Sequence, residues 1–166
     1  MIEQKIEDKV IAKLKDVLDN AGITNTQLVG QLQSVEGVKG LEEANRDAIV
    51  VVKASPRSYS KATIPTCQIN VQVTALVRAD IDYNGVNYLT ATDKMMNVFQ
   101  HWQRCYDDTH EDFTVENEFD CTGFQLNNGN FTLDGNGKLW QYQHSFTVFG
   151  VVLEYLNNNN NNENEV

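Results

Sequence analysis

The sequence predicts an α+β fold, in which an antiparallel β-sheet carries two helices on one of its faces and forms two layers. The stretch CQINVQVTALVRADID, residues 67–82, has an apolar side chain at every odd position. This is the period of a strand with one buried face. Two other stretches carry apolar residues at helical spacing instead. The resulting order, α-β-β-α-β-β, is typical of a sheet covered by helices on one side.

The length and composition indicate one domain, over residues 1–155. The whole chain has 166 residues, of which 41% are hydrophobic and 22% charged, so a sizeable core can form. Residues 156–166 are a polyasparagine tail. We expect this tail to be flexible because it has too little apolar surface to bury.

The charge balance argues against two classes of partner. The chain has 23 acidic and 13 basic side chains, for a net charge of −10. Such a surface repels a phosphate backbone, so we expect no specific nucleic-acid binding. No apolar run approaches the length of a membrane span, and no apolar core of a signal peptide is present. Three widely spaced cysteines suggest reduced thiols in a cytosolic protein.

The first half of the chain supplies a helix and a strand. Residues 2–21 carry an apolar stripe and are followed by a capping glycine, which predicts an amphipathic helix. Residues 23–47 form a polar connection with room for a short strand or helical turn. The apolar, β-branched run 48–54 predicts a buried strand. Residues 55–65 contain both prolines and carry Arg57 and Lys61 without a compensating acid, and we expect a long exposed loop or hairpin tip between two strands.

The middle of the chain begins with the long strand. Residues 67–82 would extend for about 50 Å, longer than an ordinary strand, so we expect this strand either to reach beyond the domain toward a neighbouring subunit or to bend at the edge of the domain. A turn at 83–85 feeds a short strand at 86–89. Thr90 and Asp93 have the spacing of a capping box, which predicts a second helix starting there.

The last third is predicted to return to β structure. The acidic stretch 107–112 is expected to be a solvated loop, and residues 113–121 alternate as a strand does. Asn128-Gly129 and the DGNG of 134–137 are turn signals. Residues 139–155 then predict a second long strand, apolar on both faces toward its end.

A search for chemistry finds no catalytic motif. The chain has no nucleophile elbow, phosphate loop, dinucleotide fingerprint or zinc-protease helix. His101 and Cys105 stand at i, i+4 on the second helix, where two metal ligands could lie side by side. No third ligand can be named from the sequence, so we expect no metal, no cofactor and no enzymatic activity. The remaining alternative is a small ligand- or metal-binding domain that uses His101 or the carboxylates of 107–112.

The order and local sequence of these elements resemble those of the tail terminator proteins of long-tailed bacteriophages. AIVVVKA, a loop and INVQVTALVRAD are similar to the first hairpin of that family. LTATDKMMNVFQHW resembles its second helix, and LWQYQHSFTVFGVV its last strand. The NNG and DGNG insertions and the asparagine tail depart from its simplest members.

The resemblance implies a structural virion protein without catalytic residues. Such a protein would form a ring, expected to be a homohexamer, that caps the tail tube and joins it to the head-side connector. It would be located in the virion tail or neck after assembly in the host cytoplasm. The alternative within this class is another tail-tube or neck-completion subunit.

The loop between the first two strands would meet neighbouring subunits or the tube. The candidate interface residues are Arg57, Tyr59, Lys61, Arg78 and Asp80.

Overall fold

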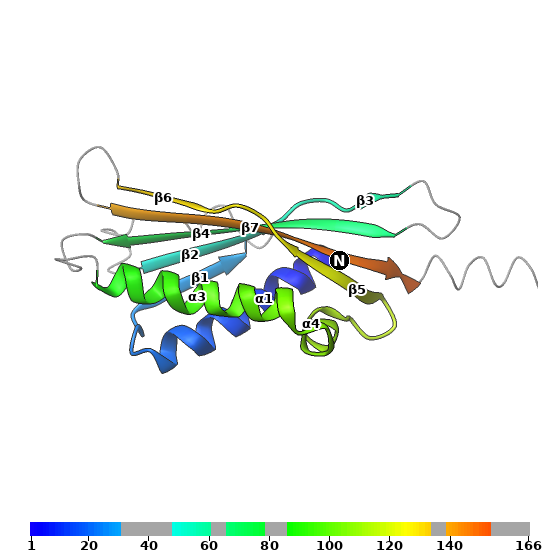
Figure 1. Ribbon diagram of the computed structural model, residues 1–166, viewed down its shortest axis with the longest axis horizontal. Helices are drawn as coiled ribbons and strands as arrows, with labels where there is room; N and C mark the ends of the chain where they lie inside the picture. The colour runs from blue at the N-terminus through cyan, green and yellow to red at the C-terminus, as the bar shows by residue number, and fades with distance from the viewer. Residues whose placement is uncertain (31–47, 61–65, 79–85, 134–138, 154–166) are drawn as a thin grey trace, which may run out of the picture.

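The computed structural model describes residues 1–30, 48–60, 66–78, 86–133 and 139–153. Its centre is a seven-stranded sheet of order β1-β2-β4-β7-β5, in which β3 lies beside β4 and β6 beside β7 (Figure 1). The strands are β1 Thr26–Gly30, β2 Ala48–Ala54, β3 Ser58–Tyr59, β4 Cys67–Arg78, β5 Phe119–Leu126, β6 Asn130–Leu133 and β7 Leu139–Val152. All pair antiparallel except β1 and β2, which are parallel.

The helices of the described residues cover one face of this sheet (Figure 1). They are α1 Ile2–Asn20, α3 Val86–Arg104 and α4 Tyr106–Phe113. The two-layer α+β prediction is therefore confirmed. The third helix corrects one expectation, because α4 stands where the acidic stretch was predicted to be a loop. Two acids in the first turn of α4, Asp107 and Asp108, lie where the helix dipole favours negative charge.

The end of α1 is fixed by glycine, as predicted. Gly22 has a φ of 81° and donates its N–H to the Asp19 carbonyl at 3.0 Å, while Ile23 donates to Leu18 at 3.0 Å. This pair of bonds is the Schellman arrangement, in which a residue with positive φ closes the last turn. Ile23 also packs against the core, so the chain turns back toward the sheet.

The length of β4 is explained within the chain itself. Along one side it pairs with β7 over its full length, from Cys67 opposite Gly150 to Arg78 opposite Leu139. Along the other side β3 and then β2 pair with it. The expectation that this strand outgrows its own domain is therefore wrong for 67–78, since sibling strands satisfy its hydrogen bonds. Residues 79–82 lie outside the described part.

Two boundaries differ from the predictions because helical packing prevails locally. Residues 86–89 begin α3 instead of forming a strand, and Thr90 is therefore inside the helix. Tyr88, one turn before Ala91, is 2% exposed and extends the buried stripe backward. Phe113 likewise ends α4 instead of starting a strand. The turn at 83–85, the DGNG turn and the tail lie outside the described residues.

The core lies between the helices and the sheet, and its densest part is aromatic. Trp102 and Phe113 meet edge to face with ring centroids 4.7 Å apart, and Phe124 and Phe146 lie 4.9 Å apart. Phe146 also contacts Phe99, at 5.4 Å. This cluster joins α3, α4, β5 and β7, and so it fixes the position of α4 at the end of α3.

Candidate functional site

The loop that follows β2 is held by the first helix. Arg57 forms an ion pair with Glu3 of α1, with 2.7 Å between Nε and the nearer carboxylate oxygen. Glu7, one turn further along α1, accepts a 2.8 Å hydrogen bond from the backbone N–H of Ala54. Residues 55–65 contain no acid of their own, but the fold supplies one to Arg57. The acid comes from a helix more than fifty residues earlier, so no local pattern could have indicated it.

Of the other candidate interface residues, Tyr59 lies beside Arg57, since side-chain hydrogen bonds with Glu3 first and then with Tyr59 raise the pKa of the Arg57 guanidinium. Tyr59 is 52% exposed on β3, beside the Cys67 end of β4. Arg78 is the last residue of β4, on the order of 36 Å away along the strand. Lys61 and Asp80 lie outside the described residues. Of the two candidate residues whose side chains the structure describes, Arg57 and Tyr59, Tyr59 is the more exposed.

The face of the sheet opposite the helices is polar but carries little charge. We refer to the side chains of β4 and β7 that point away from the helices as the outer sheet face. They alternate along each strand with side chains that point toward the helices. They are Gln68, Asn70, Gln72, Thr74, Leu76, Gln141, Gln143, Ser145, Thr147, Phe149 and Val151. None of these is charged, in a chain of net charge −10. Charged residues of the described strands border this set, at Lys53 of β2, at Arg78 where β4 ends, and at Asp120 of β5.

Hydrogen bonds order part of the outer sheet face. The Thr147 hydroxyl donates to Asn70 Oδ1 at 2.8 Å, and Asn127 Nδ2 donates to Thr147 at 3.3 Å. Gln68 and Gln72 are exposed beside them. Amide side chains of this kind can donate and accept hydrogen bonds across a contact without removing a charge from water. The sequence indicated this polar face through its alternation, but not that β7 extends it.

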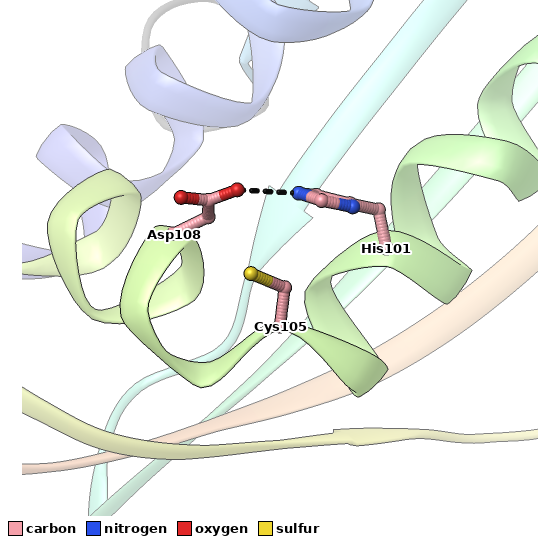
Figure 2. Close-up of side chains that lie close together, drawn as sticks. All are labelled: His101, Cys105 and Asp108. Carbon is pink, nitrogen blue, oxygen red and sulfur yellow. Dashed lines mark hydrogen bonds and ion pairs between the residues drawn. The ribbon is translucent and has the colours of Figure 1, made fainter.

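A second cluster lies at the elbow between α3 and α4 (Figure 2). His101 Nε2 and Asp108 Oδ2 are 2.7 Å apart, and the Cys105 thiol lies between them on the chain. One ligand atom of each residue lies within 4.8 Å of the other two. The hydrogen bond with His101, followed by that with Cys105, holds the pKa of the Asp108 carboxyl below its usual value. The sequence predicted that His101 and Cys105 lie side by side on one helix. It did not indicate Asp108 as the third residue, because residues 107–112 were expected to form a loop.

The remaining histidines have different settings. His110 of α4 meets Asp120 of β5 at 2.8 Å on the surface. His144 of β7 is 5% exposed and stacks against Phe99 with 5.4 Å between ring centroids. Burial lowers the pKa of His144, partly opposed by a hydrogen bond with the backbone of Asn127. The uncharged imidazole is thus part of the core.

A cavity opens where β6 begins, on the sheet beside His144. It has a volume of about 310 Å³ and is lined by Gln72, Asn128, Gly129, Asn130, Gln143, His144 and Ser145. Its lining is uncharged at neutral pH. It therefore continues the character of the outer sheet face toward the β5–β6 connection.

Comparison with known proteins identifies no relative from which the role of these residues could be inferred. No protein-family model matches the chain, and no curated protein matches it in sequence. None of the helices in the described residues is both long and apolar enough to cross a membrane.

Proposed function

We propose that this protein is a structural subunit of a virus particle, a tail terminator that forms a ring on the end of the tail tube and joins it to the head-side connector. Its partners would be further copies of itself, the tube protein and the connector protein. It would act in the virion tail or neck without enzymatic activity. The observation that carries the proposal is the uncharged outer sheet face on a strongly acidic chain.

The charge distribution favours contact between copies at this face. Two acidic subunits repel each other wherever their charged surfaces meet. The outer sheet face adds little to this repulsion, because Gln68, Gln72 and their neighbours carry no charge. Burying ionised side chains there would be costly, whereas amides and hydroxyls exchange water for partner hydrogen bonds. In a closed ring the contacts are head-to-tail, so the outer sheet face of one copy would meet a different surface of the next copy.

The element order supports the family part of the proposal. A helix, a hairpin whose second strand is long, a second helix and a further long strand follow one another along the chain. This is the outline on which the resemblance to tail terminators rests. The acidic balance also suits a ring around a DNA passage, because the wall of such a passage must not bind the DNA.

The oligomer is tested by placing charge on the outer sheet face. The double variant Gln68→Glu, Gln72→Glu adds two acids to β4, and Gln100→Glu is a matched control on the exposed surface of α3. Light scattering coupled to gel filtration, with and without assembled tail tubes, measures the mass of the complex. We expect a closed ring for the wild type and the control, and monomers for the double variant at an unchanged melting temperature.

The role is tested in the virus itself. Deletion of the gene should give tails of uncontrolled length that fail to join heads, and the wild-type chain should restore both. Tails of normal length would refute the terminator role. Tails of normal length that still fail to join would favour the alternative, a neck-completion subunit.

A further inference from the structure

The elbow between α3 and α4 has a fixed backbone. The hydroxyl of Thr109 bridges two backbone carbonyls at this bend. Its Oγ1 lies 2.6 Å from the Trp102 carbonyl oxygen and 2.8 Å from the Cys105 carbonyl oxygen. The N–H of Cys105 donates to the His101 carbonyl at 2.8 Å, which continues the α3 pattern up to the bend. Thr109 is 1% exposed and Trp102 is 2% exposed, so the core holds this bend from beneath.

We propose that His101, Cys105 and Asp108 bind a divalent transition-metal ion of the zinc class at this elbow. The three side chains point toward one another from α3, the bend and the first turn of α4 (Figure 2). Their ligand atoms, a ring nitrogen, a sulfur and a carboxylate oxygen, lie within 4.8 Å of one another. Imidazole, thiolate and carboxylate are the three ligand types that zinc takes in proteins.

The distances fit a site that closes on the ion. With zinc–ligand bonds of about 2.0–2.3 Å, neighbouring ligand atoms of a tetrahedral site lie roughly 3.3–3.7 Å apart. The ion would replace the hydrogen bond of 2.7 Å between His101 and Asp108, whose atoms would separate by about 0.6 Å. The thiol would move inward and release its proton to solvent. Both His101 and Asp108 are about half exposed, so these movements need only side-chain rotation.

The surrounding charges are mixed, because acids on α4 favour a cation whereas Lys13 and Arg104, the residue before Cys105, oppose it. Asp107, Glu111 and Asp112 stand on the same short helix as Asp108. Lys13 of α1 lies close enough to help lower the pKa of Asp108, and its charge opposes a metal ion. Water would complete the coordination, because three protein ligands leave the fourth tetrahedral position open.

The other two cysteines do not compete for the ion. Cys67 and Cys121 are fully buried. Burial raises the pKa of each thiol to about 11, which keeps the metal-binding thiolate form rare at neutral pH. A metal that binds through sulfur in the folded protein therefore reports on Cys105.

Cobalt titration of the full-length chain tests the site. Co²⁺ is a spectroscopic substitute for zinc, and a thiolate ligand gives it a charge-transfer band in the near ultraviolet. We expect one Co²⁺ per chain with this band, and its loss when Zn²⁺ is added. Cys105→Ser should remove the band, and Asp108→Asn should weaken binding by about tenfold or more. Absence of the band in the wild type, or its survival in Cys105→Ser, would overturn the proposal.

A matched control distinguishes metal binding at this site from metal binding by any exposed histidine next to an acid. His110 and Asp120 form a similar pair at 2.8 Å, and no cysteine is grouped with them in the described residues. His110→Asn should leave Co²⁺ binding unchanged, whereas His101→Asn should weaken it. Equal losses in both variants would mean that exposed histidines bind the metal without a site.

Thermal unfolding gives a readout that does not depend on the band. An ion that binds only the folded chain raises the melting temperature, and the rise increases with the concentration of free ion. Zn²⁺ should raise it for the wild type and not for Cys105→Ser, and a chelator should reverse the rise. An equal rise in both proteins would contradict the site. These measurements are independent of ring formation, so their failure leaves the proposed function standing.

Discussion

Glu3 and Arg57, more than fifty residues apart in the sequence, form an ion pair between the first helix and the loop that follows β2. The Glu3 carboxylate accepts bonds from Arg57 Nε at 2.7 Å, from Nη2 at 2.9 Å and from the backbone N–H at 3.2 Å. Their side chains are only 6% and 23% exposed. Burial alone would raise the pKa of Glu3, but the hydrogen bonds from Arg57 outweigh it and lower the pKa. The pair joins the start of α1 to the loop after β2.

Arg57→Met should destabilise the protein by about 2–3 kcal/mol, because the Glu3 carboxylate would remain buried without its cation. Chemical denaturation at pH 7 measures this. Lys15→Met is the matched control, since Lys15 pairs with Asp19 in an exposed i, i+4 bridge. That control should change the free energy of unfolding by about 0.5 kcal/mol or less.

The Glu3–Arg57 pair should also make the free energy of unfolding depend on pH in the acidic range. Since the folded pKa of Glu3 lies below its ordinary value of 4.5, the stabilisation is complete above pH 4.5 and is lost as the pH falls below it. The wild type should therefore lose more stability than Arg57→Met in this range. Parallel pH profiles for the two proteins would contradict the role given to the pair.

His144 should make stability depend on pH in a higher window. Its pKa is lowered from 6.5 by burial, so the unfolded chain takes up a proton near pH 6.5 while the folded chain does not. The free energy of unfolding should fall as the pH drops below 6.5, by at most about 1.4 kcal/mol per pH unit. Denaturation of wild type and His144→Gln between pH 7.5 and about 5 tests this. The slope should be shallower in the variant, and an unchanged slope would assign it to another group.

Gly150 should not tolerate a side chain. A Cβ there would lie 2.3 Å from Cζ of Phe119 and 2.5 Å from the Asp120 carbonyl oxygen, so β5 and β7 could not keep their spacing. Gly150→Ala should cost about 1–3 kcal/mol. Gly123 is the control on the neighbouring strand, since a Cβ there meets Phe149 at an ordinary 3.7 Å. Similar melting temperatures for the two alanine variants would contradict this account of the close approach.

How far the sequence predicts this protein depends on the range of each interaction. The alternation of 67–78 predicted β4 and its buried face, and the helical stripe with its capping glycine predicted α1. These patterns are local consequences of strand and helix periodicity, so they survive in the fold. The acidic stretch 107–112 misled the prediction because its helix is held by Thr109 and Phe113, which the core buries.

The sequence by itself determined the α+β class, the two long strands with one apolar face, and an acidic chain without a catalytic motif. Only the tertiary structure decided that β3, β2 and β7 pair along β4, that Glu3 neutralises Arg57, and that Asp108 joins His101 and Cys105. Periodicity can be recognised from residues that are close together in the sequence. Pairing partners and ligand sets depend on which distant segments the core brings together. The spacing of residues within one segment does not reveal those contacts.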